Sequence, residues 1–207
     1  MAGNVTVVST ASLKTYTLSI SAGTGSTITV KRGSTTLSNG ATITYGDVLT
    51  ITFGASDGYN LGAHTVNGST FASGGSHTVT GAVSVVSSAT VKSFTLSISA
   101  GAGSTITVNR TSSPKQGAAT GNLANGATVY YSDKLKITFG VSEARYELGA
   151  HTVNGSTFTS GSTHTVGGAV AVASTASLRT YTLTISHDAN SAVQVKRGST
   201  RSPIWIW

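Results

Sequence analysis

The sequence predicts an all-β protein made of tandem small β-sheet units. Three observations support this prediction: a long internal repeat, apolar residues that alternate with Ser and Thr, and no sustained apolar pattern at helical spacing. Period-two alternation of β-branched residues is typical of strands with one packed face and one face in solvent. Only 9% of the residues are charged, against about 25% in an ordinary soluble domain. The hydrophobic share of 38% is nevertheless sufficient to form packed cores.

The repeat is visible in three aligned stretches, TYTLSISAGTGSTITVKRGS (15–34), SFTLSISAGAGSTITVNRTS (93–112) and TYTLTISHDANSAVQVKRGS (180–199). Tyr16, Phe94 and Tyr181 correspond, so the spacing is 78 residues from 16 to 94 and 87 residues from 94 to 181. The extra residues of the second unit fall in two Gly- and Ser-containing segments, which is typical of insertions in surface loops. Internal repetition is therefore the main organising feature of the chain.

Strands are expected in the same order in each unit. Apolar residues alternate with Thr or Ser at 16–20, a tight turn follows in AGTGS (22–26), and alternation resumes at 49–53 and 83–85. The second unit repeats the pattern at 94–98 and 135–139. The segment 83–98, which joins the units, contains neither Gly nor Pro. Extended at about 3.3 Å per residue, it would carry one strand from unit to unit, and this predicts a rod-shaped array.

The repeat boundaries predict four parts. Residues 3–14 match 81–92 and 168–179, which close the first and second units. We therefore expect a closing strand of an incomplete unit at 1–14, repeat units at 15–91 and 92–178, and opening strands of an incomplete unit with an apolar tail at 179–207.

One ten-residue segment, GAHTVNGSTF, occurs identically at 62–71 and 149–158. Asn-Gly between alternating residues is a strong signal for a two-residue hairpin, because both positions of a type I′ turn need a positive φ. With Asn67-Gly68 as the turn, Val66 is expected to pair with Ser69, and His64 to lie opposite Phe71 as an aromatic cross-strand pair. We interpret the segment as scaffold. The hairpin residues in the two copies are His64, Asn67, Gly68, Phe71, His151, Asn154, Gly155 and Phe158.

No catalytic, cofactor or metal site is expected, and the chain is not predicted to be an enzyme. The pairs His64/His77 and His151/His164 could bind zinc or nickel only with a further ligand. The chain has no Cys, and the nearest acidic residues lie in predicted turns. These histidines are therefore interpreted as structural. The glycine-containing turns lack the Lys of a phosphate-binding loop, and no nucleophile elbow is present.

The net charge of +7 does not predict nucleic-acid binding. Basic residues recur at one place in each unit, and no platform of basic and aromatic residues is visible. Weak attraction to acidic surface polymers is the expected consequence. No apolar run approaches the length of a membrane span, so membrane insertion is not expected. The first residues also show no recognisable signal peptide.

The chain resembles the divergent internalin-B-type B repeats, which occur in tandem in bacterial surface proteins and in bacteriophage virion proteins. The resemblance lies in Gly46-Asp47, Asp57-Gly58-Tyr59, the TVNG motif and the closing strand at 81–91, and it covers most of the chain. Ala63-His64 departs from the family pattern, which usually has an aromatic residue at this place after the Asp-Gly-Tyr segment. The resemblance implies small, mostly β units, some of them β-grasp-like, so we expect immunoglobulin-like or β-grasp-like sheets.

The repeat and the resemblance together predict a non-catalytic structural or adhesive module of a bacteriophage virion, as a fibre, tail or decoration protein. The missing signal peptide favours a virion surface over other extracellular locations. The alternative is the repeat region of a bacterial cell-surface adhesin. A second alternative is a carbohydrate-binding module that contacts a host-surface glycan through loops 33–40 and 111–126. Other virion or surface proteins, or further copies of the chain, are the expected partners.

Both ends carry apolar strand sequences without an obvious partner, which proteins normally cover. Our hypothesis is that the amino-terminal strand of one copy adds to the carboxy-terminal strands of another by β-augmentation, as a filament or ring. The alternative is that the ends are cut points of a longer array. The residues assigned to this assembly are Val5, Val7, Leu13, Tyr181, Leu183, Ile185, Ile204, Trp205, Ile206 and Trp207.

Overall fold

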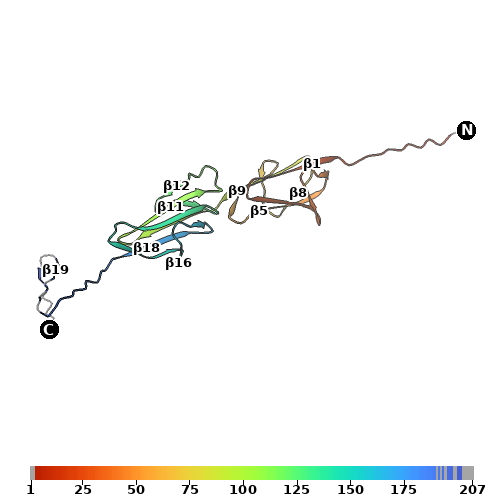
Figure 1. The fold of residues 1–207 in the computed structure, drawn as a ribbon. Coiled ribbons are helices and arrows are strands. Elements are labelled where there is room, and N and C mark those ends of the chain that lie inside the picture. Colours follow the sequence, from red (N-terminus) through yellow and green to blue (C-terminus); the bar gives the residue numbers. More distant parts are fainter. Residues whose placement is uncertain (1–2, 190, 192, 194, 198–199, 202–207) are drawn as a thin grey trace.

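The structure is a computed structural model that describes residues 3–189, 191, 193, 195–197 and 200–201. Figure 1 shows two β units placed end to end, with residues 3–14 leading into the first unit and residues 179–189 leaving the second. Every regular element in the described part of the chain is a β-strand.

The first unit is a sandwich of two sheets. The five-stranded sheet has the order β4-β1-β9-β6-β7. Its strands are β1 (Thr15–Ala22), β4 (Thr42–Thr44), β6 (Tyr59–Val66), β7 (Ser69–Thr70) and β9 (Val83–Val91). The four-stranded sheet has the order β3-β2-β5-β8. Its strands are β2 (Ser26–Arg32), β3 (Thr35–Leu37), β5 (Val48–Ala55) and β8 (Gly75–Thr78). β1 and β9 are parallel, and the other neighbours are antiparallel.

The second unit repeats this topology, with sheet orders β13-β10-β18-β15-β16 and β12-β11-β14-β17. The strands of its first sheet are β10 (Ser93–Ala100), β13 (Thr128–Tyr130), β15 (Tyr146–Val153), β16 (Ser156–Thr157) and β18 (Val170–Leu178). The strands of its second sheet are β11 (Ser104–Ser112), β12 (Gly121–Leu123), β14 (Lys134–Val141) and β17 (Thr163–Thr165). A short hairpin of β19 (Lys196–Arg197) and β20 (Thr200–Arg201) follows.

Each unit has a core of its own between its two sheets. Leu18 and Val83 pair across β1 and β9, and both belong to one buried cluster with Ile51 of strand β5 in the opposite sheet. Leu96, Val170 and other residues form the matching cluster of the second unit. Burying one such side chain contributes about 1.5–3 kcal/mol. The alternation of these residues with Thr and Ser explains the buried and exposed faces of the strands.

The fold class predicted from the sequence is confirmed: the chain is all-β and forms small sheets in tandem. The two-sheet sandwich corresponds to the immunoglobulin-like option. The β-grasp-like option, in which a helix packs on one sheet, does not fit, because no described residue is helical and a second sheet covers each core.

The segments outside the two units form no regular pairing with them. Residues 3–14 contain no strand, and neither do residues 179–189. The sequence predicted strands in both segments. Such strands are stable only when a neighbour satisfies their backbone groups, and in the described part of the chain β1 already has β4 and β9 on its two sides.

Candidate functional site

The Asn-Gly turn of the repeated segment has the geometry that its sequence predicts. Asn67 and Gly68 have φ values of 49° and 79°, and the structure pairs Val66 with Ser69 and Thr65 with Thr70. Asn67 also has a role that the local sequence does not show. Its Oδ1 accepts a hydrogen bond of 2.7 Å from the N–H of Ser84 in β9. The asparagine therefore shapes the hairpin and attaches it to the next strand of the sheet.

The first residues of the segment, Gly62 and Ala63, form a β-bulge. The pairing of β6 with β9 shifts between Leu61 and His64, and Gly62 lies within this irregular stretch. A Cβ on Gly62 would lie 2.7 Å from Ser88 Oγ, so a larger residue does not fit without a shift. Ser88 Oγ in turn donates a hydrogen bond of 3.2 Å to the carbonyl of Ala63. The bulge and the turn together explain why this ten-residue segment accommodates few substitutions.

The second copy of the segment has the same geometry. Asn154 has a φ of 50°, and its Oδ1 accepts a hydrogen bond of 2.8 Å from the N–H of Ala171. Gly155 has a φ of 78°, and Gly149 again lies in the irregular stretch of the pairing. His151 meets Phe139 at 4.9 Å, and Phe158 contacts His164 at 6.2 Å. Both copies are thus held by the same set of contacts, to the next strand of the sheet and to the facing sheet.

His64 lies opposite Phe71 in the hairpin as expected, but the expected contact between their two rings is not the one that the structure shows. His64 and Phe71 are joined through the backbone, by a hydrogen bond of 3.3 Å from the N–H of Phe71 to the carbonyl of His64. Their rings contact other residues: His64 meets Phe53 at 4.8 Å between centroids with the rings tilted by 45°, and Phe71 meets His77 edge-on at 6.2 Å. The facing sheet offers an aromatic ring to His64, and this inter-sheet contact replaces the cross-strand one.

The four histidines of the two units each pack against a phenylalanine ring. His64 Nδ1 lies 2.9 Å from the carbonyl oxygen of Gly62, which orients the ring toward Phe53. Burial lowers the pKa of His164, because the half-buried ring loses hydration that would stabilise its charge. Among the residues that the structure describes, no three His, Cys, Asp or Glu residues gather closely enough to hold a metal ion.

The joint between the two units is formed by specific contacts from both sides. The strands of the two units are separated by one residue, Lys92, which lies between β9 and β10. The N–H of Lys92 donates a hydrogen bond of 2.8 Å to the carbonyl of Gly58 in the first unit. The carbonyl of Lys92 accepts one of 2.9 Å from the N–H of Tyr131 in the second unit. The linking residue is therefore held on both sides.

The ring of Tyr131 lies directly against Gly58. A Cβ on Gly58 would lie 2.0 Å from Tyr131 Cδ1, and Gly58 is buried with a φ of 80°. Both the positive φ and the close approach of the ring require glycine at this position. The same kind of contact occurs inside the first unit, where a Cβ on Gly25 would lie 2.2 Å from Tyr59 Cδ1. We call the set Gly58, Lys92 and Tyr131 the inter-unit joint.

Sequence reasoning missed this joint, although the repeat contained a signal for it. Tyr45 and Tyr131 occupy the same repeat position, in Tyr-Gly-Asp and Tyr-Ser-Asp. Tyr45 and Tyr131 each lie in the turn that follows a short strand, β4 or β13, and an aromatic residue that recurs in a turn suggests a contact outside the unit. In the sequence Gly58 stands out only as part of the Asp57-Gly58-Tyr59 motif, because nothing local indicates that a distant ring would cover it.

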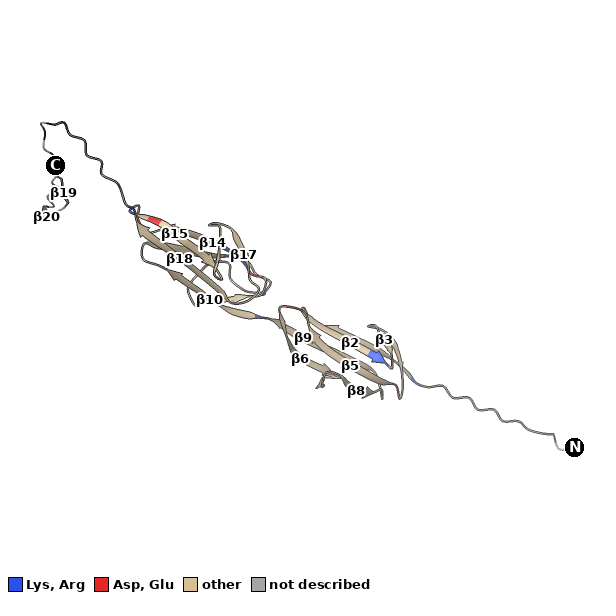
Figure 2. Cartoon of the chain, turned by 90° about the horizontal axis from the view of Figure 1, so that it is seen from below, with Lys and Arg blue, Asp and Glu red and all other residues tan. Residues whose placement is uncertain are grey.

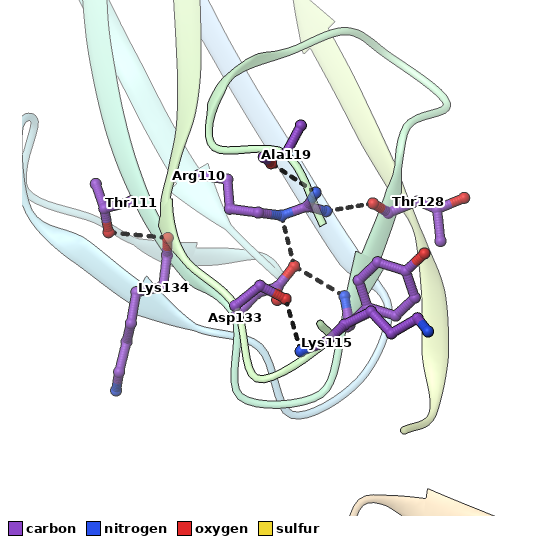
Figure 3. A network of polar contacts seen from close by, with 9 residues as sticks. Arg110, Thr111, Lys115, Ala119, Thr128, Asp133 and Lys134 are labelled. Carbon is purple, nitrogen blue, oxygen red and sulfur yellow. Dashed lines mark hydrogen bonds and ion pairs between the residues drawn. The ribbon is translucent and has the colours of Figure 1, made fainter. Parts of the chain in front are cut away.

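The longer loop of the second unit encloses an ion pair (Figure 3). Arg110 Nε lies 2.8 Å from Asp133 Oδ2, and both side chains are buried. Arg110 also donates hydrogen bonds to the carbonyls of Ala119, in the loop, and Thr128. Arg110 thus ties the loop, through Ala119, to the neighbouring strand β13.

In the first unit the corresponding pair lies at the surface. Arg32 Nη1 is 2.8 Å from Asp47 Oδ2. The backbone N–H of Thr44, and then the Arg32 side chain, lower the pKa of Asp47.

The end residues assigned to assembly lie apart from the units wherever the structure describes them. Val5 and Val7 are each 88% exposed, and Leu13, Tyr181 and Leu183 are also exposed. Ile185 is half-buried. Ile204, Trp205, Ile206 and Trp207 lie outside the described residues. The structure therefore brings none of the described end residues together.

Charged residues are sparse and scattered over both units (Figure 2). Besides the pairs already described, Arg145 forms an ion pair of 2.8 Å with Glu143 at the far end of the second unit. No helix in the described part of the chain is long and apolar enough to cross a membrane.

No family model and no curated protein matches the chain. Among solved structures it is similar to a C-terminal fragment of the pilus adhesin SpaC from Lactobacillus rhamnosus GG, at 9% identity and a TM-score of 0.44, covering 83% of this chain and 100% of that chain. A structure of the pilus adhesin SpaC from the same organism gives 9% identity and a TM-score of 0.36, covering 77% of this chain and 31% of that chain. TM-scores below 0.5 at such identities do not establish a shared function.

Proposed function

We propose that this chain is a non-catalytic, stiff spacer in a surface-displayed structural or adhesive protein. The observation that carries the proposal is the inter-unit joint, in which Tyr131 covers Gly58 and Lys92 is hydrogen-bonded to both units. A spacer holds a binding part away from a surface, and it needs units that keep a fixed relative orientation. Tandem sandwiches linked by one fixed residue meet this need.

The joint differs from a flexible linker in each relevant respect. Flexible linkers are several residues long, rich in Gly and Ser, and free of contacts with the domains they connect. Here a single lysine connects β9 to β10, and its N–H and carbonyl both have partners. Bending at Lys92 would break these hydrogen bonds and expose the buried Gly58–Tyr131 contact. The elongated arrangement in Figure 1 is therefore expected to persist in solution.

Two locations are compatible with such a spacer: a bacterial cell surface and a phage virion. Neither the joint nor the sandwich fold supports the virion expectation over the bacterial one. The structural neighbours come from a bacterial pilus adhesin, at TM-scores too low to assign this chain to either location. The proposed role is therefore a physical one: the chain displays a stiff array of β units outside a cell.

Carbohydrate binding is not proposed as a second function. Sugar recognition commonly uses exposed aromatic rings, and neither loop 33–40 nor loop 111–126 contains an aromatic residue. Ala119, in the second loop, turns its carbonyl inward to Arg110. No described feature of these loops favours a sugar site.

Distance measurements between spin labels on the two units test the proposal. The chain has no Cys, so Thr29→Cys and Thr107→Cys create unique labelling sites at exposed positions of β2 and β11. A single narrow distance distribution is expected for the otherwise unchanged chain. Tyr131→Ala should broaden it, because the side chain that fixes the joint is removed. A broad distribution in the unchanged chain would refute the spacer proposal.

Tyr45→Ala is the matched control for this experiment. Tyr45 occupies the same repeat position as Tyr131, and its ring is exposed at the opposite end of the first unit. Its removal should leave the distance distribution between the two units unchanged. An equal broadening with Tyr45→Ala would show that the tyrosine acts through the stability of its own unit and not through the joint.

A further inference from the structure

The first unit carries, at its amino-terminal end, half of a joint like the one between the two units. Tyr45 is the counterpart of Tyr131, and Lys14 is the counterpart of Lys92. The N–H of Tyr45 donates a hydrogen bond of 2.9 Å to the carbonyl of Lys14, as that of Tyr131 does to Lys92. Lys92 and Tyr131 are the residues that the second unit contributes to the inter-unit joint. Their counterparts Lys14 and Tyr45 are therefore already arranged in the same way at the amino-terminal end of the first unit.

No described residue takes the place that Gly58 has in the inter-unit joint. The N–H of Lys92 bonds to Gly58, whereas the N–H of Lys14 has no acceptor in the described part of the chain. Tyr45 is 53% exposed, while Tyr131 is half-buried against Gly58. Ser12, Leu13, Lys14 and Tyr45 line a hollow at this end. We call these four residues the front half-joint.

We propose that the front half-joint docks a further repeat unit that presents a glycine turn of the Ser56–Tyr59 type. Residues 5–13 would form the closing strand of that unit, as the matching residues 83–91 do in the first unit. This inference rests on the proposed spacer function and names its partner. The docked glycine carbonyl would accept the N–H of Lys14, and the ring of Tyr45 would cover the glycine.

The observed pairing gives the register of the docked unit. In the first unit, Tyr59 beside the glycine turn pairs with Val91, and Leu18 pairs with Val83. The same register places Leu13 opposite the tyrosine of the docked turn, and Val5 opposite the leucine of the docked opening strand. Leu13 is 72% exposed in the structure, whereas Val91 is half-buried in its sheet. Docking would therefore cover the exposed apolar residues 5, 7 and 13.

The far end of the second unit does not offer the same surface, which argues against a second copy as the occupant. Arg145 stands at the place of Gly58, since its carbonyl accepts the N–H of Arg179 just as that of Gly58 accepts the N–H of Lys92. The Arg145 side chain lies over the Tyr146 ring, at 5.3 Å from its centroid, and pairs with Glu143. A tyrosine ring cannot approach this backbone as Tyr131 approaches Gly58.

The test adds one unit in front of the chain. A copy of residues 15–80 is joined directly to Gly3, so that residues 3–14 follow it as 81–92 follow the first unit. Amide hydrogen exchange of Lys14 is compared in the extended and original chains. Exchange at Lys14 should slow by at least about tenfold on extension, because protection reports a closed hydrogen bond. A matched variant carries arginine in place of the added turn's glycine, and it should return exchange at Lys14 to the original rate.

The Lys92 amide separates failure of this inference from failure of the spacer proposal. If Lys92 is protected in the extended chain and Lys14 is not, the inference is overturned and the spacer proposal stands. If Lys92 is also unprotected, the spacer proposal fails first. Sedimentation of the original chain tests the competing occupant: concentration-dependent association that Tyr45→Ala abolishes would assign the surface to a second copy and overturn the inference.

Discussion

Arg110 and Asp133 form an ion pair inside the second unit, where their side chains are only 5% and 0% exposed. The equivalent Arg32 and Asp47 form the same pair at the surface of the first unit. The difference comes from the longer loop 111–126, whose residue Ala119 lies over the arginine (Figure 3). Taking two charges out of water is costly, so the buried pair is strongly sensitive to the loss of one partner.

Asp133→Asn is expected to destabilise the second unit by about 3–5 kcal/mol, because it leaves the buried Arg110 charge uncompensated. The substitution keeps the shape of the side chain, so packing changes little. The free energy of unfolding in urea measures the effect. Adding Arg110→Met to Asp133→Asn should recover part of the loss, since the buried charge is then removed. The surface substitution Asp47→Asn should cost less, and an equal cost in both units would contradict the role assigned to burial.

The two units are expected to unfold as separate cores. Leu18 and Leu96 are fully buried at equivalent positions in two clusters that share no residue. Leu96→Ala should destabilise the second unit by about 2–5 kcal/mol through lost burial and the cavity left behind. Leu18→Ala should do the same to the first unit. Scanning calorimetry should show one of the two transitions moving in each variant, and a joint shift of both would indicate one cooperative unit.

Asn67 should stabilise the first unit in two separate ways, through its backbone conformation and through its side-chain hydrogen bond. Asn67→Gly keeps the positive φ but loses the hydrogen bond to Ser84, which should cost about 1 kcal/mol. Asn67→Ala loses the same hydrogen bond and also places in the left-handed region a residue without the polar side chain by which asparagine tolerates it, which adds roughly 1–2 kcal/mol relative to glycine. The ranking by free energy of unfolding should therefore be Asn, then Gly, then Ala. Equal losses for the Gly and Ala variants would show that only the side-chain hydrogen bond matters.

Features set by neighbouring residues could be predicted from the sequence. Alternation identified the buried faces, and Asn67-Gly68 indicated the turn and its register. Contacts between distant residues could not be predicted. The contact of His64 with Phe53 depends on how the two sheets face each other, and the contact of Tyr131 with Gly58 depends on how two units meet.

The burial of Arg110 shows the same limit, because it depends on the path of an inserted loop. The repeat did contain indirect information on such contacts, since an aromatic residue that recurs in a turn, like Tyr45 and Tyr131, indicates a contact beyond its own unit.

His164 should make the stability of the second unit depend on pH. Burial lowers its pKa from the usual 6.5, so the folded unit binds this proton less readily than the unfolded chain. The resulting contribution to stability is fully present above pH 6.5 and declines as the pH falls below it. Unfolding free energies measured between pH 7.5 and pH 5 on the chain and on His164→Gln test this. The slope of stability against pH should be smaller in the variant, because glutamine does not titrate, and an unchanged slope would assign the pH dependence to other groups.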